Sequence, residues 1–162
     1  MLTVADDNFW MQKALAEALQ AGAKKEVPVG AVAVFENRIV GRGHNQVESL
    51  KDATAHAEML ALTSASQTLE SWRLGGVTLY TTLEPCTMCA GAAILSRIDR
   101  LVYAAKDPKA GACGSVLDIL GNGRFNHQVK VDYFPLSEAE MLLKQFFKDL
   151  RTETERVSEK KN

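Results

Sequence analysis

The chain has 162 residues, of which 46% are hydrophobic, and its formal net charge at pH 7 is −1. This length and apolar fraction suit one globular domain with a sizeable core. The near-zero charge excludes a strongly basic protein that binds nucleic acid without specificity, but it leaves room for a local basic patch.

The hydrophobic periodicity predicts helices and strands in alternation along the chain. In order, these are a helix capped by Asp6 or Asp7 and ending near Ala21, strands 27–35 and 38–43, a helix ending near Leu69, a strand 77–83, a helix ending near Ser96, strands 100–105 and 129–133, and a helix from Ser137. This alternation predicts an α/β fold, a three-layer α/β/α sandwich with a mixed sheet of about five strands.

The last predicted helix has the clearest signals. Ser137 and Glu140 match a capping box, and an apolar stripe that we assign to the core follows at helical spacing. The stripe comprises Ala139, Leu142, Leu143, Phe146, Phe147 and Leu150. Beyond Arg151 the chain is charged and has no such stripe. We therefore expect residues 1–151 to form one domain and residues 152–162 to form a frayed or disordered tail.

No feature of the sequence indicates export or membrane insertion. Asp6 and Asp7 stand where a signal peptide would carry basic residues, and no apolar stretch is long enough to span a bilayer. The chain has 3 cysteines, and two of them are spaced like metal ligands, which fits a reducing compartment better than a disulfide scaffold. We therefore expect a cytoplasmic protein with no membrane partner.

Two thiols stand three residues apart, directly after a predicted buried strand and a proline. Pro85 suits the first position of a helix, so Cys86 and Cys89 should share one face of its first turn. The positive end of that helix favours thiolates over thiols. The two could be buried apolar cysteines instead, but a matching upstream motif favours half of a metal site.

That motif is His56 and Glu58, separated by one alanine. His56 with Cys86 and Cys89 makes a His/Cys/Cys set, which suits zinc and leaves the fourth tetrahedral position open. An open position is typical of catalytic zinc, and Glu58 is then the natural proton shuttle. Residues i and i+2 of a regular helix lie about 200° apart, so we expect an irregular helix start with Thr54 as the N-cap.

The H-x-E and P-C-x-x-C pattern resembles the zinc deaminases that act on nucleobases. Further stretches are similar to the bacterial tRNA-specific adenosine deaminase family, and the similarity extends over residues 10–151. The stretches that carry it are 26–31, 54–58, 81–91 and 107–114. The zinc motif by itself identifies only the wider deaminase superfamily, and the flanking stretches narrow it to the tRNA-editing branch.

The resemblance implies a cytidine deaminase-like fold and the hydrolytic conversion of adenosine to inosine at the first, or wobble, anticodon position of a tRNA. It implies one Zn²⁺ per chain, with Glu58 moving protons between the attacking water, the ring and the leaving amine. The usual substrate of the family is an arginine tRNA. Family members are homodimers in which both chains meet the anticodon stem-loop.

The resemblance also assigns substrate contacts. Asn45 would hydrogen-bond the flipped nucleoside, although by itself it is typical of a turn asparagine. Asp107 would contact the ribose-phosphate backbone at a 2′-hydroxyl, although it could equally cap a turn before Pro108. The remaining residues expected around the base are Val29, Leu83, Glu84 and Phe147. The basic residues that could either neutralise phosphates or remain solvated are Lys106, Lys109 and Arg151.

Two other functions share parts of this pattern. A deaminase of a free base or nucleoside, of guanine or cytosine type, would have the same zinc motif. A structural zinc module would need a fourth ligand, for which Cys113 is the spare thiol. The small residues around Cys113 favour packing instead, and Glu58 favours catalysis. His44 and His127 are expected in loops or at the surface.

Overall fold

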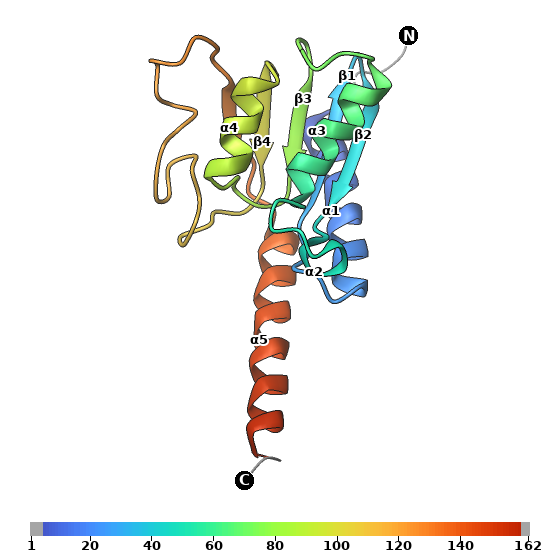
Figure 1. Cartoon of the computed structure of the whole chain (residues 1–162), viewed down its shortest axis with the longest axis vertical. Helices are drawn as coiled ribbons and strands as arrows, with labels where there is room; N and C mark the ends of the chain where they lie inside the picture. The colour runs from blue at the N-terminus through green and yellow to red at the C-terminus, as the bar shows by residue number, and fades with distance from the viewer. Residues whose placement is uncertain (1–4, 160–162) are drawn as a thin grey trace.

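The computed structural model describes residues 5–159 and contains one sheet of five strands with helices packed on it (Figure 1). The elements in chain order are α1 (Asp7–Ala23), β1 (Gly30–Phe35), β2 (Arg38–His44), α2 (Val47–Leu50), α3 (Ala57–Thr68), β3 (Thr78–Thr81), α4 (Thr87–Leu95), β4 (Arg100–Tyr103), β5 (Lys130–Tyr133) and α5 (Ser137–Glu159). The predicted order of the strands and of the four longer helices is confirmed. The short α2, which falls in a predicted loop, was not expected.

The sheet is mixed, with strand order β2-β1-β3-β4-β5. The hairpin of β1 and β2 turns at Glu36 and Asn37, both with positive φ, and β1 also pairs antiparallel with β3. The pairs β3–β4 and β4–β5 are parallel. The carboxyl ends of β2, β3 and β4 therefore meet at one edge of the sheet, where ligands of α/β proteins usually bind.

The sheet separates two hydrophobic cores. Successive residues of a strand point to opposite faces, so Leu79 packs with the core beneath α3 and α4, while Tyr80 packs with the core beneath α1 and α5. Ala61 of α3 and Met11 of α1 are buried on these opposite faces. The predicted three-layer α/β/α sandwich is confirmed.

Glycines in β2 let α3 approach the sheet closely. A methyl group at Gly43 would collide with the carbonyl oxygen of Ala57, the first residue of α3, and one at Gly41 would collide with that of Ala61. Only residues without a Cβ permit this backbone approach. The close contact fixes the start of α3 over the sheet, next to the carboxyl end of β2.

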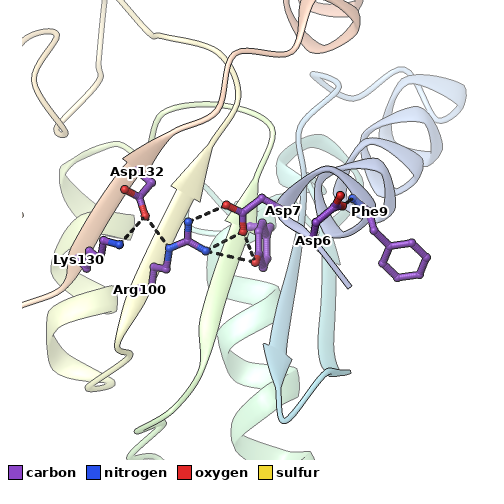
Figure 2. Close-up of polar contacts among 7 residues, drawn as sticks. Asp6, Asp7, Phe9, Arg100, Lys130 and Asp132 are labelled. Carbon is purple, nitrogen blue, oxygen red and sulfur yellow. Dashed lines mark hydrogen bonds and ion pairs between the residues drawn. The ribbon is translucent and has the colours of Figure 1, made fainter. Parts of the chain in front are cut away.

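An ion-pair network joins the opposite end of the sheet to α1 (Figure 2). Arg100, the first residue of β4, donates to Asp7 of α1 at 2.7 Å and to Asp132 of β5 at 2.6 Å. The Tyr80 hydroxyl also donates to Asp7. The hydrogen bonds from Arg100 hold the pKa of Asp7 below its usual value. The network thus ties three strands to the start of α1, away from the carboxyl ends.

The C-terminal helix differs from its prediction. Its apolar stripe packs only at the start, where Ala139 is buried, whereas Phe147 and Leu150 are 41% and 48% exposed. The physical reason is that α5 extends beyond the end of the sheet, so no layer faces its second half (Figure 1). The capping box is replaced by a hydrogen bond from the Ser137 hydroxyl to Glu138.

The charged tail is also different from the expectation of fraying or disorder. Residues 152–159 continue α5, and the hydroxyl groups of Thr152 and Thr154 donate to carbonyl oxygens one turn earlier. Charged residues such as Glu, Lys and Arg are good helix formers even without an apolar face. The last three residues, 160–162, lie outside the described part of the chain. Within residues 5–159, no helix is both long and apolar enough to cross a membrane.

Candidate metal centre and active site

Cys86 and Cys89 lie at the start of α4, each two helix positions earlier than predicted, because the helix begins at Thr87 and not at Pro85. Cys86 is the N-cap in extended backbone, not a helical residue, and its carbonyl oxygen accepts from the N–H of Ala90 at 2.9 Å. Pro85 therefore precedes the N-cap instead of opening the helix. The separation of three residues still brings the thiols together, because Cys89 lies in the first turn.

His56 is itself the N-cap of α3, in place of Thr54. Its backbone is extended (φ −76°, ψ 151°), and its carbonyl oxygen accepts from the N–H of Leu60 at 3.1 Å. Thr54 instead donates from its N–H and hydroxyl to Asp52. Since His56 is outside the helix and Glu58 is inside it, the 200° separation of a regular helix does not apply, and both side chains reach one site.

The side chains of His56, Cys86 and Cys89 place their ligand atoms within 4.8 Å of one another. The Nδ1 atom of His56 lies 3.6 Å from each of the two sulfurs. A tetrahedral zinc ion with bonds of about 2.3 Å to sulfur and about 2.0–2.1 Å to nitrogen separates these atoms by roughly 3.6 Å. The trio therefore fits zinc in both donor chemistry and spacing.

The titration of these groups reflects their mutual contact. Hydrogen bonds with Cys89 and His56 lower the pKa of the Cys86 thiol to about 3. A hydrogen bond with Cys86 raises the pKa of His56, and a separate hydrogen bond with Cys86, together with burial, raises the pKa of Cys89. A divalent cation favours both thiolates and a neutral imidazole. Binding of a metal ion at this site would therefore release protons.

Glu58 is 4% exposed and stands beside the trio. One carboxylate oxygen, Oε2, lies 3.6 Å from the sulfur of Cys89, and the other, Oε1, accepts from the hydroxyl of Thr81 at 3.2 Å. Burial raises the pKa of Glu58. A carboxyl group in this state holds a proton more readily, as a general acid-base group requires.

A cavity of about 260 Å³ opens over His56, Glu58 and Cys86. Its lining includes most of the side chains that the sequence predicts around the base: Val29, Asn45, Leu83, Glu84 and Asp107. Phe147 lies instead in an adjoining groove of about 700 Å³ between α5 and residues 105–109. The groove and the cavity share Val27, Leu83 and Asp107.

The predicted substrate residues also have structural contacts. The Asn45 side chain donates to the carbonyl of Val27 and accepts from the N–H of Val47, at 3.3 and 3.4 Å. Asp107 accepts from the N–H groups of residues 109 and 110 through Oδ1, which makes it a turn cap. These contacts fix where both side chains stand at the cavity wall.

Glu84 is buried and faces the loop that follows β4. Its carboxylate accepts from the N–H groups of Asp107, Cys113 and Ser115 and from the Ser115 hydroxyl. Burial opposes ionisation, but these bonds outweigh it and keep the pKa of Glu84 below its usual value. Glu84 therefore orders a cavity wall, a role that its sequence position does not reveal.

Thr81 and Glu26 are two further site residues that the sequence did not single out. Thr81 contacts Glu58, and buried Glu26 accepts from the N–H groups of Glu48 and Ser49 in α2. Both lie in stretches that carry the family resemblance, which was the available signal. Cys113 is not part of the metal trio in the described chain. His44 contacts Glu17, and His127 contacts the carbonyl of Ile98.

Comparison with known proteins shows the family to which the chain belongs. A model of the MafB19-like deaminase family matches residues 5–151. The tRNA-specific adenosine deaminase of Aquifex aeolicus is 50% identical over 143 residues, which are 88% of this chain and 95% of that protein. The chain belongs to the tRNA-specific adenosine deaminase family. The relative of that name in Bacillus subtilis is 46% identical over 91% of this chain and 92% of its own length. The family resemblance noted in the sequence is confirmed.

Solved structures show the same fold. One comes from a study of A-to-I editing by tRNA:A34 deaminases at the wobble position of transfer RNA, and it has a TM-score of 0.80 and 43% identity. The match covers 84% of this chain and 99% of that one. A guanine deaminase from Nitrosomonas europaea has a TM-score of 0.77 and 26% identity, over 89% of this chain and 86% of that one. The cytidine deaminase-like fold class is confirmed.

Proposed function

We propose that this enzyme uses zinc to convert adenosine to inosine at the wobble position of a tRNA, with an arginine tRNA as its substrate. The observation that carries the proposal is the His/Cys/Cys trio beside a buried glutamate at the bottom of one cavity. We take adenosine as the base and tRNA as the substrate from the relatives, which are tRNA-specific adenosine deaminases.

His56, Cys86 and Cys89 would hold one zinc ion per chain. A bound zinc ion acts as a Lewis acid that makes a water molecule a nucleophile at neutral pH. Glu58 accepts a proton from the water that attacks C6 of adenine. It delivers this proton to the ring nitrogen, takes the second proton from the new hydroxyl group at C6 and delivers it to the amine, which leaves as ammonia. The burial that raises the pKa of Glu58 suits it to hold these protons between steps.

Recognition of the base would occur in the cavity over Glu58, after the base leaves its stack. Asn45 uses one amide donor and one oxygen lone pair for Val27 and Val47. A primary amide has a second donor and a second lone pair, which we assign to the nucleoside. Val29, Leu83 and the backbone at Glu84 would enclose the base.

The adjoining groove would receive the nucleotides beside the target. Four of its side chains are basic and two, Asp107 and Glu140, are acidic, so the groove has a net positive charge on a chain of net charge −1. The basic residues are Lys106, Lys109, Lys144 and Arg151. Phe147 is 41% exposed at the same groove and offers a surface on which a splayed base can stack. The local positive charge and base stacking at the groove can thus bind RNA although the chain as a whole has almost no net charge.

Asp107 lines both the cavity and the groove, where a ribose would pass. We propose that its carboxylate accepts from a 2′-hydroxyl, in addition to its two bonds within the turn. Replacing Asp107 by Asn should then weaken the preference for an RNA stem-loop over the matched DNA. An unchanged RNA-to-DNA ratio of kcat/KM would contradict this role.

We further propose a homodimer that works in the cytoplasm, where tRNA is modified. The dimer is implied by the family resemblance, and both chains would contact the anticodon stem-loop. Light scattering of the zinc-loaded protein at micromolar concentration measures the mass directly. A mass of one chain, with and without the stem-loop, would contradict the dimer.

The test of function is incubation of the zinc-loaded protein with an anticodon stem-loop of an arginine tRNA whose first anticodon base is adenosine. We expect inosine in the stem-loop, and far slower reaction of free adenosine, free cytidine and duplex RNA. The control is Glu58→Gln, which should keep its zinc and lose at least about 100-fold in rate. Full activity of that variant would remove Glu58 from the mechanism.

Guanine deamination is the second candidate, because guanine deaminases have the same fold at 26–27% identity. It is tested in the same assay by following ammonia release from free guanine, cytosine and cytidine. Faster turnover of any of these than of the stem-loop would replace the tRNA assignment with a small-molecule deaminase. The groove next to the cavity favours the larger substrate.

A further inference from the structure

Thr81 is the last residue of β3 and is fully buried next to the proposed proton shuttle. Its side chain lies on the same face of the strand as Leu79, beneath α3 and α4. A threonine hydroxyl without a partner is costly at such a position. The hydroxyl of Thr81 therefore needs a hydrogen-bond partner among the groups around it.

The hydroxyl of Thr81 lies 3.2 Å from Oε1 of Glu58 and 3.3 Å from the carbonyl oxygen of Leu83. A hydroxyl has one hydrogen to donate, and a charged acceptor forms a stronger bond than a neutral carbonyl. Thr81 therefore donates to Glu58 whenever Glu58 is ionised. The other oxygen, Oε2, points to the sulfur of Cys89 and hence to the metal trio.

We infer that Thr81 is a positioning residue that gives the two oxygens of Glu58 different tasks. The hydroxyl holds Oε1, so that Oε2 remains directed at the metal trio and the cavity and makes the proton transfers. This inference rests on the proposed function, in which Glu58 is the proton shuttle.

Thr82, the residue directly after β3, shows what a purely structural threonine does next to Thr81. Thr82 is buried like Thr81, but its hydroxyl accepts from the N–H of Gly30 at 3.1 Å. The pair therefore supplies a matched control. Thr82→Val removes a buried threonine hydrogen bond to the backbone without touching Glu58, whereas Thr81→Val removes the bond to the shuttle.

The kinetic test compares these variants as zinc-loaded proteins on the anticodon stem-loop. We expect Thr81→Val to lower kcat about 10-fold, with KM within twofold of the wild type and full zinc content. This corresponds to the loss of about 1.4 kcal/mol of transition-state stabilisation. Thr81→Ser should restore most of kcat because it restores the hydroxyl. Thr82→Val should keep kcat close to the wild type.

A double substitution separates action through Glu58 from a general loss of packing. In a Glu58→Gln background, Thr81→Val should change the residual rate less than twofold, since the group on which Thr81 acts has already been replaced. A full 10-fold effect in that background would overturn the inference. So would a wild-type kcat for Thr81→Val alone. If Thr81→Val does not fold, Thr81→Ala carries the same expectations.

Crystal structures of the zinc-loaded wild type and Thr81→Val provide a readout that does not depend on activity. The carboxylate of Glu58 should have one orientation in the wild type and a rotated or divided one in the variant. An unchanged single orientation would overturn the inference. If the wild type deaminates no stem-loop, the proposed substrate fails, and this structural comparison still decides whether Thr81 positions Glu58.

Discussion

Glu84 controls a large part of the cavity wall through a single carboxylate. Its Oε1 accepts from the N–H groups of Cys113 and Ser115, each at 3.0 Å, and its Oε2 accepts from the N–H of Asp107 at 2.9 Å and from the Ser115 hydroxyl. Gly111 lies so close that a methyl group there would collide with the carboxylate. We therefore predict that Glu84→Gln loosens residues 107–115.

The magnitude follows from the number of acceptors that remain. A glutamine amide keeps one oxygen, which can serve the two N–H groups now bound to Oε1. The NH₂ group of the glutamine would then face the N–H of Asp107, and two hydrogen-bond donors cannot bond each other. The Ser115 hydroxyl can rotate and accept a hydrogen bond from the NH₂ group, but the N–H of Asp107 is left without an acceptor. One unsatisfied buried donor costs about 1–3 kcal/mol, and loss of the charge weakens the other bonds. We expect the free energy of unfolding to fall by about 3 kcal/mol.

The assay is urea unfolding of zinc-loaded protein, combined with amide hydrogen exchange at Cys113 and Ser115. Exchange at both amides should accelerate in Glu84→Gln, because they lose their charged acceptor. The control is Glu48→Gln: the Glu48 side chain is 76% exposed and has one ion pair, so less than about 0.5 kcal/mol should be lost. Equal stability of the two variants, with unchanged exchange at Cys113 and Ser115, would refute the reasoning.

Three further predictions concern the metal, the ion-pair network and the helix contact. Zinc binding, measured by atomic emission, should be abolished in each of three variants: His56→Ala, Cys86→Ala and Cys89→Ala. Full zinc content in any one of them would remove that residue from the ligand set. Asp7→Asn should lower stability by about 1–2 kcal/mol at neutral pH. The pKa of Asp7 is below 3.8 in the folded chain, so the stability difference between the wild type and Asp7→Asn should persist above pH 3.8 and shrink as the pH falls through the folded pKa. Urea unfolding at pH 7 and at about pH 2.5 measures this change, and an equal stability difference at both pH values would contradict the reasoning. Gly43→Ala should cost about 2–3 kcal/mol and lower kcat, since a methyl group there collides with the start of α3; a stable and fully active variant would contradict this.

The local patterns of the sequence determined the types and order of the main elements. Alternating apolar residues and helical periodicity are properties of neighbouring residues, so they predicted the strands and the helices α1, α3, α4 and α5. The same holds for the metal ligands, whose residue types and spacing identify the chemistry before any fold is known. The family resemblance added the expected substrate, which no local pattern specifies.

Local patterns misplaced what depends on distant contacts. Thr54 is as good an N-cap as any residue by propensity, but His56 takes that position, and Gly43 allows the start of α3 to approach the sheet closely. The stripe on α5 predicts a buried face, yet whether another layer covers it depends on how far the sheet extends. Phe147 is therefore exposed at a groove instead of buried in a core.

The tertiary structure alone decided how the site is held. Glu58 meets Thr81 across 23 positions of sequence, and Glu84 meets Ser115 across 31. Contacts over such separations depend on strand order and on which face each strand presents, and neither is encoded in a window of neighbouring residues. The sequence therefore named the groups that we propose bind metal and move protons, whereas the packing of α3 and α4 on one sheet determined which oxygen of Glu58 faces the metal trio.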